Sequence, residues 1–275
     1  MQTVVENRFT AWMDNPNDPT INNKIHAADG AKEYGYRAAL VGGVTVYGWC
    51  VPTILEALGE SWLDRGWVEV NFRRPTYPGD EMTISAAHND DAWVLTAKNQ
   101  AGEPCITGSA GLGDAPWLGM LELSQRLAPD PEPNPRPQLT LENAPIGKDI
   151  LTRRFAVSVD DAHAYARNKM RSHDPLWRGE QPFVHPSMFA LQMITHLNYC
   201  YEYGRPSIHA SSHIQHLARA RAGQEFTLTG HFIDAYERRG HHYAVFDGDF
   251  IAEDGTEVAR IRHTNIIKVA KRESS

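Results

Sequence analysis

Residues 43–58 read GVTVYGWCVPTILEAL, and the 18 residues from Ala38 to Leu55 contain no charged side chain. That length is close to the threshold for a membrane span. However, Gly48 and Pro52 interrupt the segment, and the mean hydropathy of the whole chain is −0.47. A helix that is apolar on every side is usually surrounded by protein. We therefore expect a buried central helix over 43–58 and no association with a membrane.

The region that follows this helix alternates between apolar and polar residues, and the same order of segments occurs again later in the chain. A second apolar helix is predicted over 186–201. Alternating runs rich in β-branched residues, separated by turn residues, are typical of half-buried antiparallel strands. The predicted strands are 67–75, 81–88, 92–99 and 104–112 after the first helix, and 207–220, 226–234, 241–252 and 257–269 after the second.

The stretch APDPEPNPRP, residues 128–137, has proline at every second position and predicts an extended, semi-rigid linker. On either side of it, matching residues recur at nearly constant offsets. The pairs are Asn23 and Asn168 (offset 145), Gly43 and Pro186 (143), and Gly79 and Gly223 (144). The chain is thus predicted to be a duplication: an N-terminal repeat over 1–126, the linker over 127–145 and a C-terminal repeat over 146–275.

A helix that is apolar all round and is followed by an antiparallel sheet can be buried if the sheet curls around it. Two such units joined edge to edge would form one long sheet that wraps two helices. We therefore predict an α+β protein with the double hotdog fold. Because the outer edges and faces of such a sheet need covering, we also expect a homodimer.

The charge balance and the cysteines exclude several classes of protein. The chain of 275 residues has 27 basic and 34 acidic side chains, a net charge of −7, which argues against a nucleic-acid partner. Cys50, Cys105 and Cys200 are far apart and contain no CxxC pair, so neither a disulfide framework nor a cysteine-rich zinc site is expected. No secretory signal is recognisable at the start of the sequence, and we expect a cytoplasmic protein.

Four short segments surround the first helix in a distinctive order. They are Asn23-Lys24-Ile25-His26, Ala39-Leu40-Val41-Gly42-Gly43-Val44, Phe72, and Tyr77-Pro78-Gly79-Asp80. Together they resemble the MaoC-like acyl-CoA hydratases and dehydratases. That family has an Asp, then Asn-Pro-Ile-His, then Ile-Ala-His-Gly before the central helix, and later Phe and Pro-Val-Pro-Gly-Asp.

The resemblance implies hydration or dehydration of an acyl thioester, with His26 as the proton-transfer residue. Such a reaction needs a base that deprotonates water, an acid that protonates the α-carbon, and a hydrogen-bond donor to the enolate oxygen. The backbone N–H of Gly43, or of Gly42, is the expected donor at the start of the helix. Ile21 stands where the family has its catalytic Asp, so another group is needed to hold the water, and Asn23 and Asp29 are candidates.

The second repeat offers further candidates for the site. His173 and Asp174 lie where the first repeat has His26, and His185-Pro186 corresponds to the family's His-Gly before the helix. The site could therefore be assembled from the second repeat or shared between both. Arg73 and Arg74 could contact the phosphates of coenzyme A.

No metal site or separate cofactor is predicted; coenzyme A or an acyl carrier would enter as part of the substrate. His209, His213 and His216 resemble a metal cluster, but strand alternation would put 209 and 213 on one face and 216 on the other. Besides a hydratase or dehydratase, two other functions agree with the sequence. One is a hotdog acyl thioesterase, and the other is a catalytically silent subunit that binds an acyl group.

Overall fold

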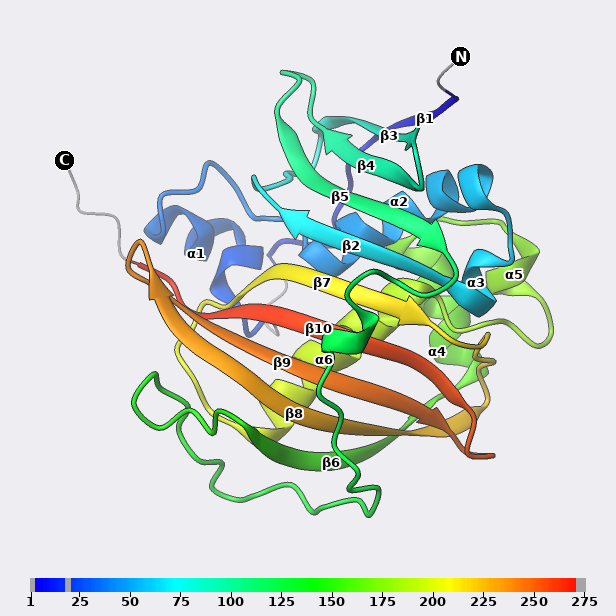
Figure 1. Ribbon diagram of the computed structural model, residues 1–275. Coiled ribbons are helices and arrows are strands. Elements are labelled where there is room, and N and C mark those ends of the chain that lie inside the picture. The colour runs from blue at the N-terminus through cyan, green and yellow to red at the C-terminus, as the bar shows by residue number, and fades with distance from the viewer. Residues whose placement is uncertain (1–2, 18–20, 271–275) are drawn as a thin grey trace.

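The computed structural model describes residues 3–17 and 21–270, and its main feature is one antiparallel sheet of ten strands (Figure 1). In space the strands follow the order β1-β3-β4-β5-β2-β7-β10-β9-β8-β6. The strands of the first half are β1 (Val4–Thr10), β2 (Gly66–Phe72), β3 (Glu81–Asn89), β4 (Ala92–Lys98) and β5 (Pro104–Leu112). Those of the second half are β6 (Lys148–Val157), β7 (Ile208–His216), β8 (Gln224–Arg238), β9 (His241–Ala252) and β10 (Glu257–Lys268).

Two long helices lie against the inner face of this sheet, and shorter helical turns connect the strands (Figure 1). The long helices are α2 (Gly43–Leu58) and α6 (Pro186–Cys200). The short ones are η1 (Lys24–His26), α1 (Ala28–Glu33), α3 (Trp62–Arg65), η2 (Leu118–Met120), α4 (Val159–Ala164), the π-helical turn η3 (Tyr165–Lys169) and α5 (Pro175–Arg178).

The two halves of the sheet have the same strand order. Read from the outer edge to the centre, it is β1-β3-β4-β5-β2 in the first half and β6-β8-β9-β10-β7 in the second. The two halves meet at β2 and β7, which pair from Trp67–Gln215 to Asn71–Ser211. The prediction of two helices, each wrapped by one half of a continuous antiparallel sheet, is therefore confirmed.

Helix α2 is buried on most of its surface because apolar side chains cover most of its sides. Tyr47 and Trp49 lie about 200° apart around the helix and are both buried, whereas Pro52 and Glu56 form a narrow exposed strip. Gly48 lets the chain packed against α2 approach closely, since a Cβ there would lie 2.5 Å from the sulfur of Met170. No helix in the described ranges is long and apolar enough to cross a membrane.

Strands β1 and β6 form the two ends of the sheet, and the sequence analysis did not identify them. In β1 the side chains alternate between exposed and half-buried, so the apolar signal is weak. Strand β6 is interrupted by a register shift between Ile150 and Arg153, which disturbs its alternation. Edge strands with few buried side chains carry little periodic hydrophobicity, which explains why both were missed.

The segment between β5 and β6 crosses the outer face of the second half of the sheet (Figure 1). Arg262 on β10 donates to the carbonyl of Met120 at 2.7 Å, and Asp247 on β9 accepts from the N–H of Glu122 at 2.7 Å. Further along, the N–H of Asp130 donates to the carbonyl of Thr152 on β6 at 2.8 Å. The segment between β5 and β6 thus covers part of the outer face and, through its linker portion, part of the β6 edge.

The interior contains an unusual number of histidines. Burial lowers the pKa of four of them to about 3 and lowers that of a fifth well below its ordinary value of 6.5. The four are His185, His196, His209 and His216, and the fifth is His263. Each is neutral in the folded protein but takes up a proton in the unfolded chain once the pH falls below about 6.5.

We predict that the folded state is lost on mild acidification, between about pH 6 and pH 4.5. Each buried histidine removes about 1.4 kcal/mol of stability per pH unit below about pH 6.5, or roughly 2 kcal/mol at pH 5. Asp249 acts in the opposite direction, because burial raises its pKa to about 7 and its folded form binds a proton first. The remaining loss is on the order of the whole stability of a domain, about 5–15 kcal/mol. Circular dichroism melts from pH 7.5 to 4.5 test this, and a constant melting temperature from pH 7 to 5 would contradict it.

Candidate functional site

A cavity of about 970 Å³ lies where the N-terminus of α2 approaches the sheet. Its walls come from both halves: the loop around η1, the start of α2, the ends of β2 and β7, the middle of α6 and the end of β10. Arg73 and Arg74 lie at its β2 side, whereas Asn198 and Tyr243 lie toward α6 and β9. A cavity of this size is within the range of sites that enclose a substrate-sized molecule.

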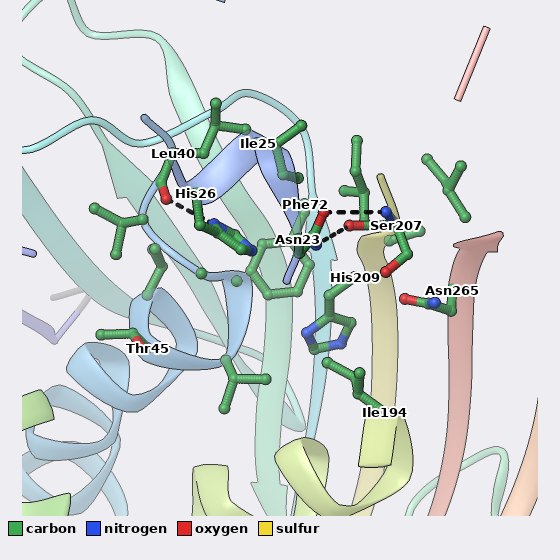
Figure 2. Close-up of a pocket in the computed structure, with 18 of the residues that line it drawn as sticks. Asn23, Ile25, His26, Leu40, Thr45, Phe72, Ile194, Ser207, His209 and Asn265 are labelled. Carbon is green, nitrogen blue, oxygen red and sulfur yellow. Dashed lines mark hydrogen bonds between the residues drawn. The ribbon is translucent and has the colours of Figure 1, made fainter. Parts of the chain in front are cut away.

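His26 projects into this cavity from the end of η1 (Figure 2). Its Nδ1 lies 2.8 Å from the carbonyl of Leu40. A carbonyl oxygen can only accept, so Nδ1 carries the proton and Nε2 of the neutral ring presents a lone pair. Burial lowers the pKa of His26, the bond to Leu40 opposes this, and the positive charge of Lys169 lowers it further. His26 is therefore a neutral base at pH 7, with an Nε2 that forms no hydrogen bond within the described ranges.

The loop that carries His26 is held by a small apolar cluster and by one amide. Ile25 packs with Ala31 and Leu40, and the N–H of Leu40 donates to the carbonyl of Ile25 at 2.8 Å. Asn23 donates from Nδ2 to the carbonyl of Ser207 at 2.7 Å and accepts from the N–H of Ser207 at 3.3 Å (Figure 2). Asn23 is thus placed to fix the loop to the start of β7.

The N-terminus of α2 opens into the cavity beside His26. Gly42 is the N-cap residue and supplies no side-chain cap, so the first N–H groups of the helix, from Gly43 and Val44, keep no acceptor within the described ranges. A Cβ on Gly42 would lie 3.9 Å from Cε1 of His26. A Cβ on Gly43 would lie 3.1 Å from the ring of Phe72 and 3.2 Å from Cβ of His209. The two glycines therefore keep the helix end accessible and close to the sheet.

The N-terminus of α6, by contrast, is closed. Nδ1 of His185 accepts from the N–H of Ser187, and Pro186 has no N–H to offer. The rings of Tyr165 and Trp177 pack against His185 at centroid distances of 5.8 and 4.8 Å. The hollow at this end of α6 measures only about 10 Å³. His185 caps a helix here and does not line the large cavity.

Three other predicted site residues also lie outside the cavity. Asp29 is on the exposed side of α1, where its nearest ionic partner is Lys32 at 4.0 Å. His173 and Asp174 are exposed in the loop before α5; Asp174 caps that helix through the N–H of Leu176, and His173 contacts Arg178. His173 and Asp174 occupy the position in the second repeat that corresponds to His26 in the first. The loop that carries them, however, folds over the closed end of α6.

Arg73 and Arg74 line the mouth of the cavity as exposed side chains. Arg74 pairs with Glu103 at 3.4 Å, whereas the Nε of Arg73 donates to Oγ1 of Thr107 at 2.8 Å. The guanidinium groups leave donors available toward the cavity, as a phosphate-binding position requires.

A second cavity of about 390 Å³ joins the first at His26 and Gly42. Ile21 lines it, so no carboxylate faces His26 from that position. Instead Lys169 at the end of η3 lines both cavities and forms an ion pair with Asp14. This pair was not predicted from the sequence, although the offset that matches Asn168 with Asn23 also matches Lys169 with Lys24.

The prediction that His209 and His213 share a face was wrong because β7 contains a bulge. Strand β10 advances one residue from Thr264 to Asn265, while its partners on β7 change from Ser211 to His209. The extra residue, Ala210, turns His209 to the inner face, which is also the face of His216, whereas His213 contacts Trp117 on the outer face. No group of three or more metal-ligating side chains occurs among the described residues.

We predict that His26 titrates below pH 6.5 and is protonated on Nδ1 in its neutral form. Burial disfavours the imidazolium, and the Leu40 carbonyl selects the tautomer. Long-range ¹H–¹⁵N correlation spectra recorded between pH 5.5 and 8, assigned with a His26→Gln variant, measure both properties. A pKa at or above 6.5, or a proton on Nε2, would contradict the geometry.

The comparison with known proteins identifies the fold. No protein-family model and no curated protein matches the sequence. A solved structure described as a MaoC domain protein dehydratase from Chloroflexus aurantiacus has a TM-score of 0.63 at 11% identity and covers 98% of this chain and 95% of its own. A Mycobacterium tuberculosis protein described as having a double hotdog fold has a TM-score of 0.58 at 13% identity, over 92% and 88% of the two chains.

Structures with other described activities also match. One described as an oleoyl thioesterase from Lactobacillus plantarum has a TM-score of 0.51 at 11% identity and covers 97% of both chains. Likeness at this level of identity concerns the fold and leaves the reaction to be argued from the site. The chain has the double hotdog fold, the same fold as solved proteins described as MaoC-like dehydratases.

Proposed function

We propose that this protein is a MaoC-like hydratase or dehydratase acting on an α,β-unsaturated or 3-hydroxy acyl thioester. One observation carries the proposal: the unpaired Nε2 of His26 lies in a cavity beside the uncapped N-terminus of α2. A base and a set of backbone donors facing one enclosed space are what the addition of water to a conjugated thioester requires.

In the hydration direction, Nε2 of His26 accepts a proton from water while the water oxygen bonds to the β-carbon. The electrons of the double bond move toward the thioester carbonyl, whose oxygen becomes an enolate. The N–H groups of Gly43 and Val44 and the positive end of the helix dipole stabilise that charge. The imidazolium then returns its proton to the α-carbon, so water is added and the enzyme is unchanged. Dehydration is the reverse sequence.

His26 would act in both proton transfers because Ile21 replaces the carboxylate of the resembling family. The ammonium of Lys169 is close enough to His26 to depress its pKa, and its positive charge would also favour the enolate. The reaction uses no metal or redox cofactor. Coenzyme A, or the phosphopantetheine of a carrier protein, would leave the cavity past Arg73 and Arg74, which could contact its phosphates.

The first test of the proposal is His26→Ala, compared with His173→Ala as a matched histidine control. We expect His26→Ala to lower kcat/KM by roughly 10²–10⁴-fold, since it removes the base that lies beside the N-terminus of α2. His173→Ala should retain wild-type activity because His173 lies outside the cavity. A panel of enoyl-CoA thioesters, followed through loss of the conjugated-thioester absorbance, measures this. Unchanged circular dichroism shows that a variant is folded; full activity in folded His26→Ala would refute the proposed role.

A thioesterase is the second candidate, favoured by the missing carboxylate at position 21. His26 could activate water toward the thioester carbonyl, and the same N–H groups would stabilise the tetrahedral intermediate. The two reactions release different products. Free thiol measured with a thiol reagent indicates hydrolysis, whereas loss of conjugation without thiol release indicates hydration. A silent subunit would show neither reaction and no effect of His26→Ala.

We also propose that the protein is a cytoplasmic homodimer. The three cysteines are buried free thiols, in keeping with a reducing compartment. Edge strand β1 has exposed side chains at alternate positions and no neighbour on its outer side within the described chain. We expect light scattering at micromolar concentration to give about 62 kDa, twice the chain mass of 30.8 kDa. A mass of one chain across that range would exclude the dimer.

A further inference from the structure

Two buried polar side chains in the cavity wall each have one nitrogen without a hydrogen-bond partner among the described residues. His209 on β7 and Asn265 on β10 are directly opposite each other across the two strands, and both line the cavity (Figure 2). They are 6% and 1% exposed. Nδ1 of His209 and Nδ2 of Asn265 form no hydrogen bond within the described ranges. The bulge at Ala210 is what brings His209 to this face beside Asn265.

The ring of His209 is held firmly in place. Its Nε2 lies 2.8 Å from Oγ of Ser212, which in turn lies 2.9 Å from Nδ1 of His263. The two imidazoles stack at a centroid distance of 4.4 Å, and Phe72 packs against the other side of His209, also at 4.4 Å. A ring fixed in this way cannot turn to find another partner for Nδ1. Nδ1 therefore stays unpaired unless a molecule bound in the cavity supplies a partner.

Apolar side chains form part of the wall beside this pair. Ile194, Ile208 and Ile266 line the cavity there and offer no side-chain hydrogen bond. Both nitrogens have less than 1 Å² of solvent-accessible area, so solvent does not satisfy them in this structure. A hydrocarbon chain beside them would leave both groups buried and unpaired, which is unfavourable. A bound molecule with an oxygen atom at this point would avoid that penalty.

We propose that His209 and Asn265 select an acyl group that carries a hydroxyl or keto oxygen beyond the reacting double bond. This inference rests on the proposed acyl-thioester function and adds the class of acyl chain. His209 is next to the helix end, since a Cβ on Gly43 would lie 3.2 Å from its Cβ. The recognised oxygen thus lies within a few bonds of the thioester. A hydroxyl can donate to one of the two side chains and accept from the other.

The test compares substrates that differ only by that oxygen. Hex-2-enoyl-CoA and its 4-, 5- and 6-hydroxy derivatives are assayed with wild-type protein and with Asn265→Leu, a variant of similar volume that lacks the amide. We expect at least one hydroxylated thioester to be preferred by wild type. Asn265→Leu should reduce this preference about 10–100-fold, because only the oxygenated chain loses a partner.

Thr229→Val is the matched control. Thr229 is also fully buried with an unpaired hydroxyl oxygen, but it does not line the cavity. This control should leave the substrate preference unchanged. If Asn265→Leu lowers kcat/KM equally for all the thioesters, the amide contacts the shared pantetheine portion and the proposal is wrong. A wild-type preference for the plain hydrocarbon chain would also overturn it.

Binding measurements keep this inference separate from the proposed reaction. Calorimetry with unreactive S-hexyl-CoA and S-(hydroxyhexyl)-CoA thioethers gives a ratio of dissociation constants that needs no turnover. In one outcome no thioester reacts, yet the hydroxylated thioethers bind about 10–100-fold more tightly than S-hexyl-CoA and Asn265→Leu removes the difference. The proposed selection of an oxygenated acyl group then holds, and the hydratase proposal fails. In the other outcome the thioesters react, but the ratio of dissociation constants is close to one in wild type. The proposed selection of an oxygenated acyl group then fails, and the hydratase proposal is retained.

Discussion

Helix α2 is apolar on nearly all of its surface, with only Pro52 and Glu56 exposed, and the architecture depends on this constraint. A helix of this kind has to be enclosed, and a curled antiparallel sheet can enclose it along its length. Apart from that narrow strip, only the two ends of the helix approach the surface of the molecule. The N-terminal end carries free N–H groups, so enclosing the helix also produces a sheltered spot with concentrated positive character. The candidate site lies at this end of the helix.

The two halves follow the same plan but treat this end of the helix differently. Gly42 and Gly43 leave the start of α2 open and close to Phe72, whereas His185 and Pro186 cap and close the start of α6. A molecule with twofold-related repeats could hold two such sites, yet the second position is filled by aromatic side chains. The wall of the remaining cavity comes in part from β7, β10 and α6. The second half therefore contributes a wall to the site of the first half.

Patterns that are periodic in the sequence were sufficient to predict the frame of the molecule. The apolar runs over α2 and α6 and the alternation of eight strands came directly from residue order, and the motif around His26 pointed to the end of α2 where the large cavity lies. The edge strands β1 and β6 lack that periodicity and were not found. The roles of Asp29, His173 and Asp174 could not be judged from spacing, because a loop of the same length can turn toward the cavity or away from it.

Contacts between distant segments are harder still to predict. The pairing of Asp14 with Lys169 joins residues 155 positions apart along the chain, and nothing in either segment alone indicates it. The expectation for His209 failed for a local reason: strand alternation assumes an unbroken register, and one unpaired residue at position 210 reverses it.

The bulge at Ala210 has a wider meaning for proteins built from repeats. A substitution changes one side chain. One residue inserted near the end of a strand does more, because between the insertion and the strand end the side chains that faced outward now face inward. The pairing of the rest of the strand with its neighbours is unchanged. In a duplicated sheet this change can be made in one copy alone. Two copies that began with the same interior can then acquire different chemical linings through a difference in length, a change that position-by-position comparison of the repeats does not reveal.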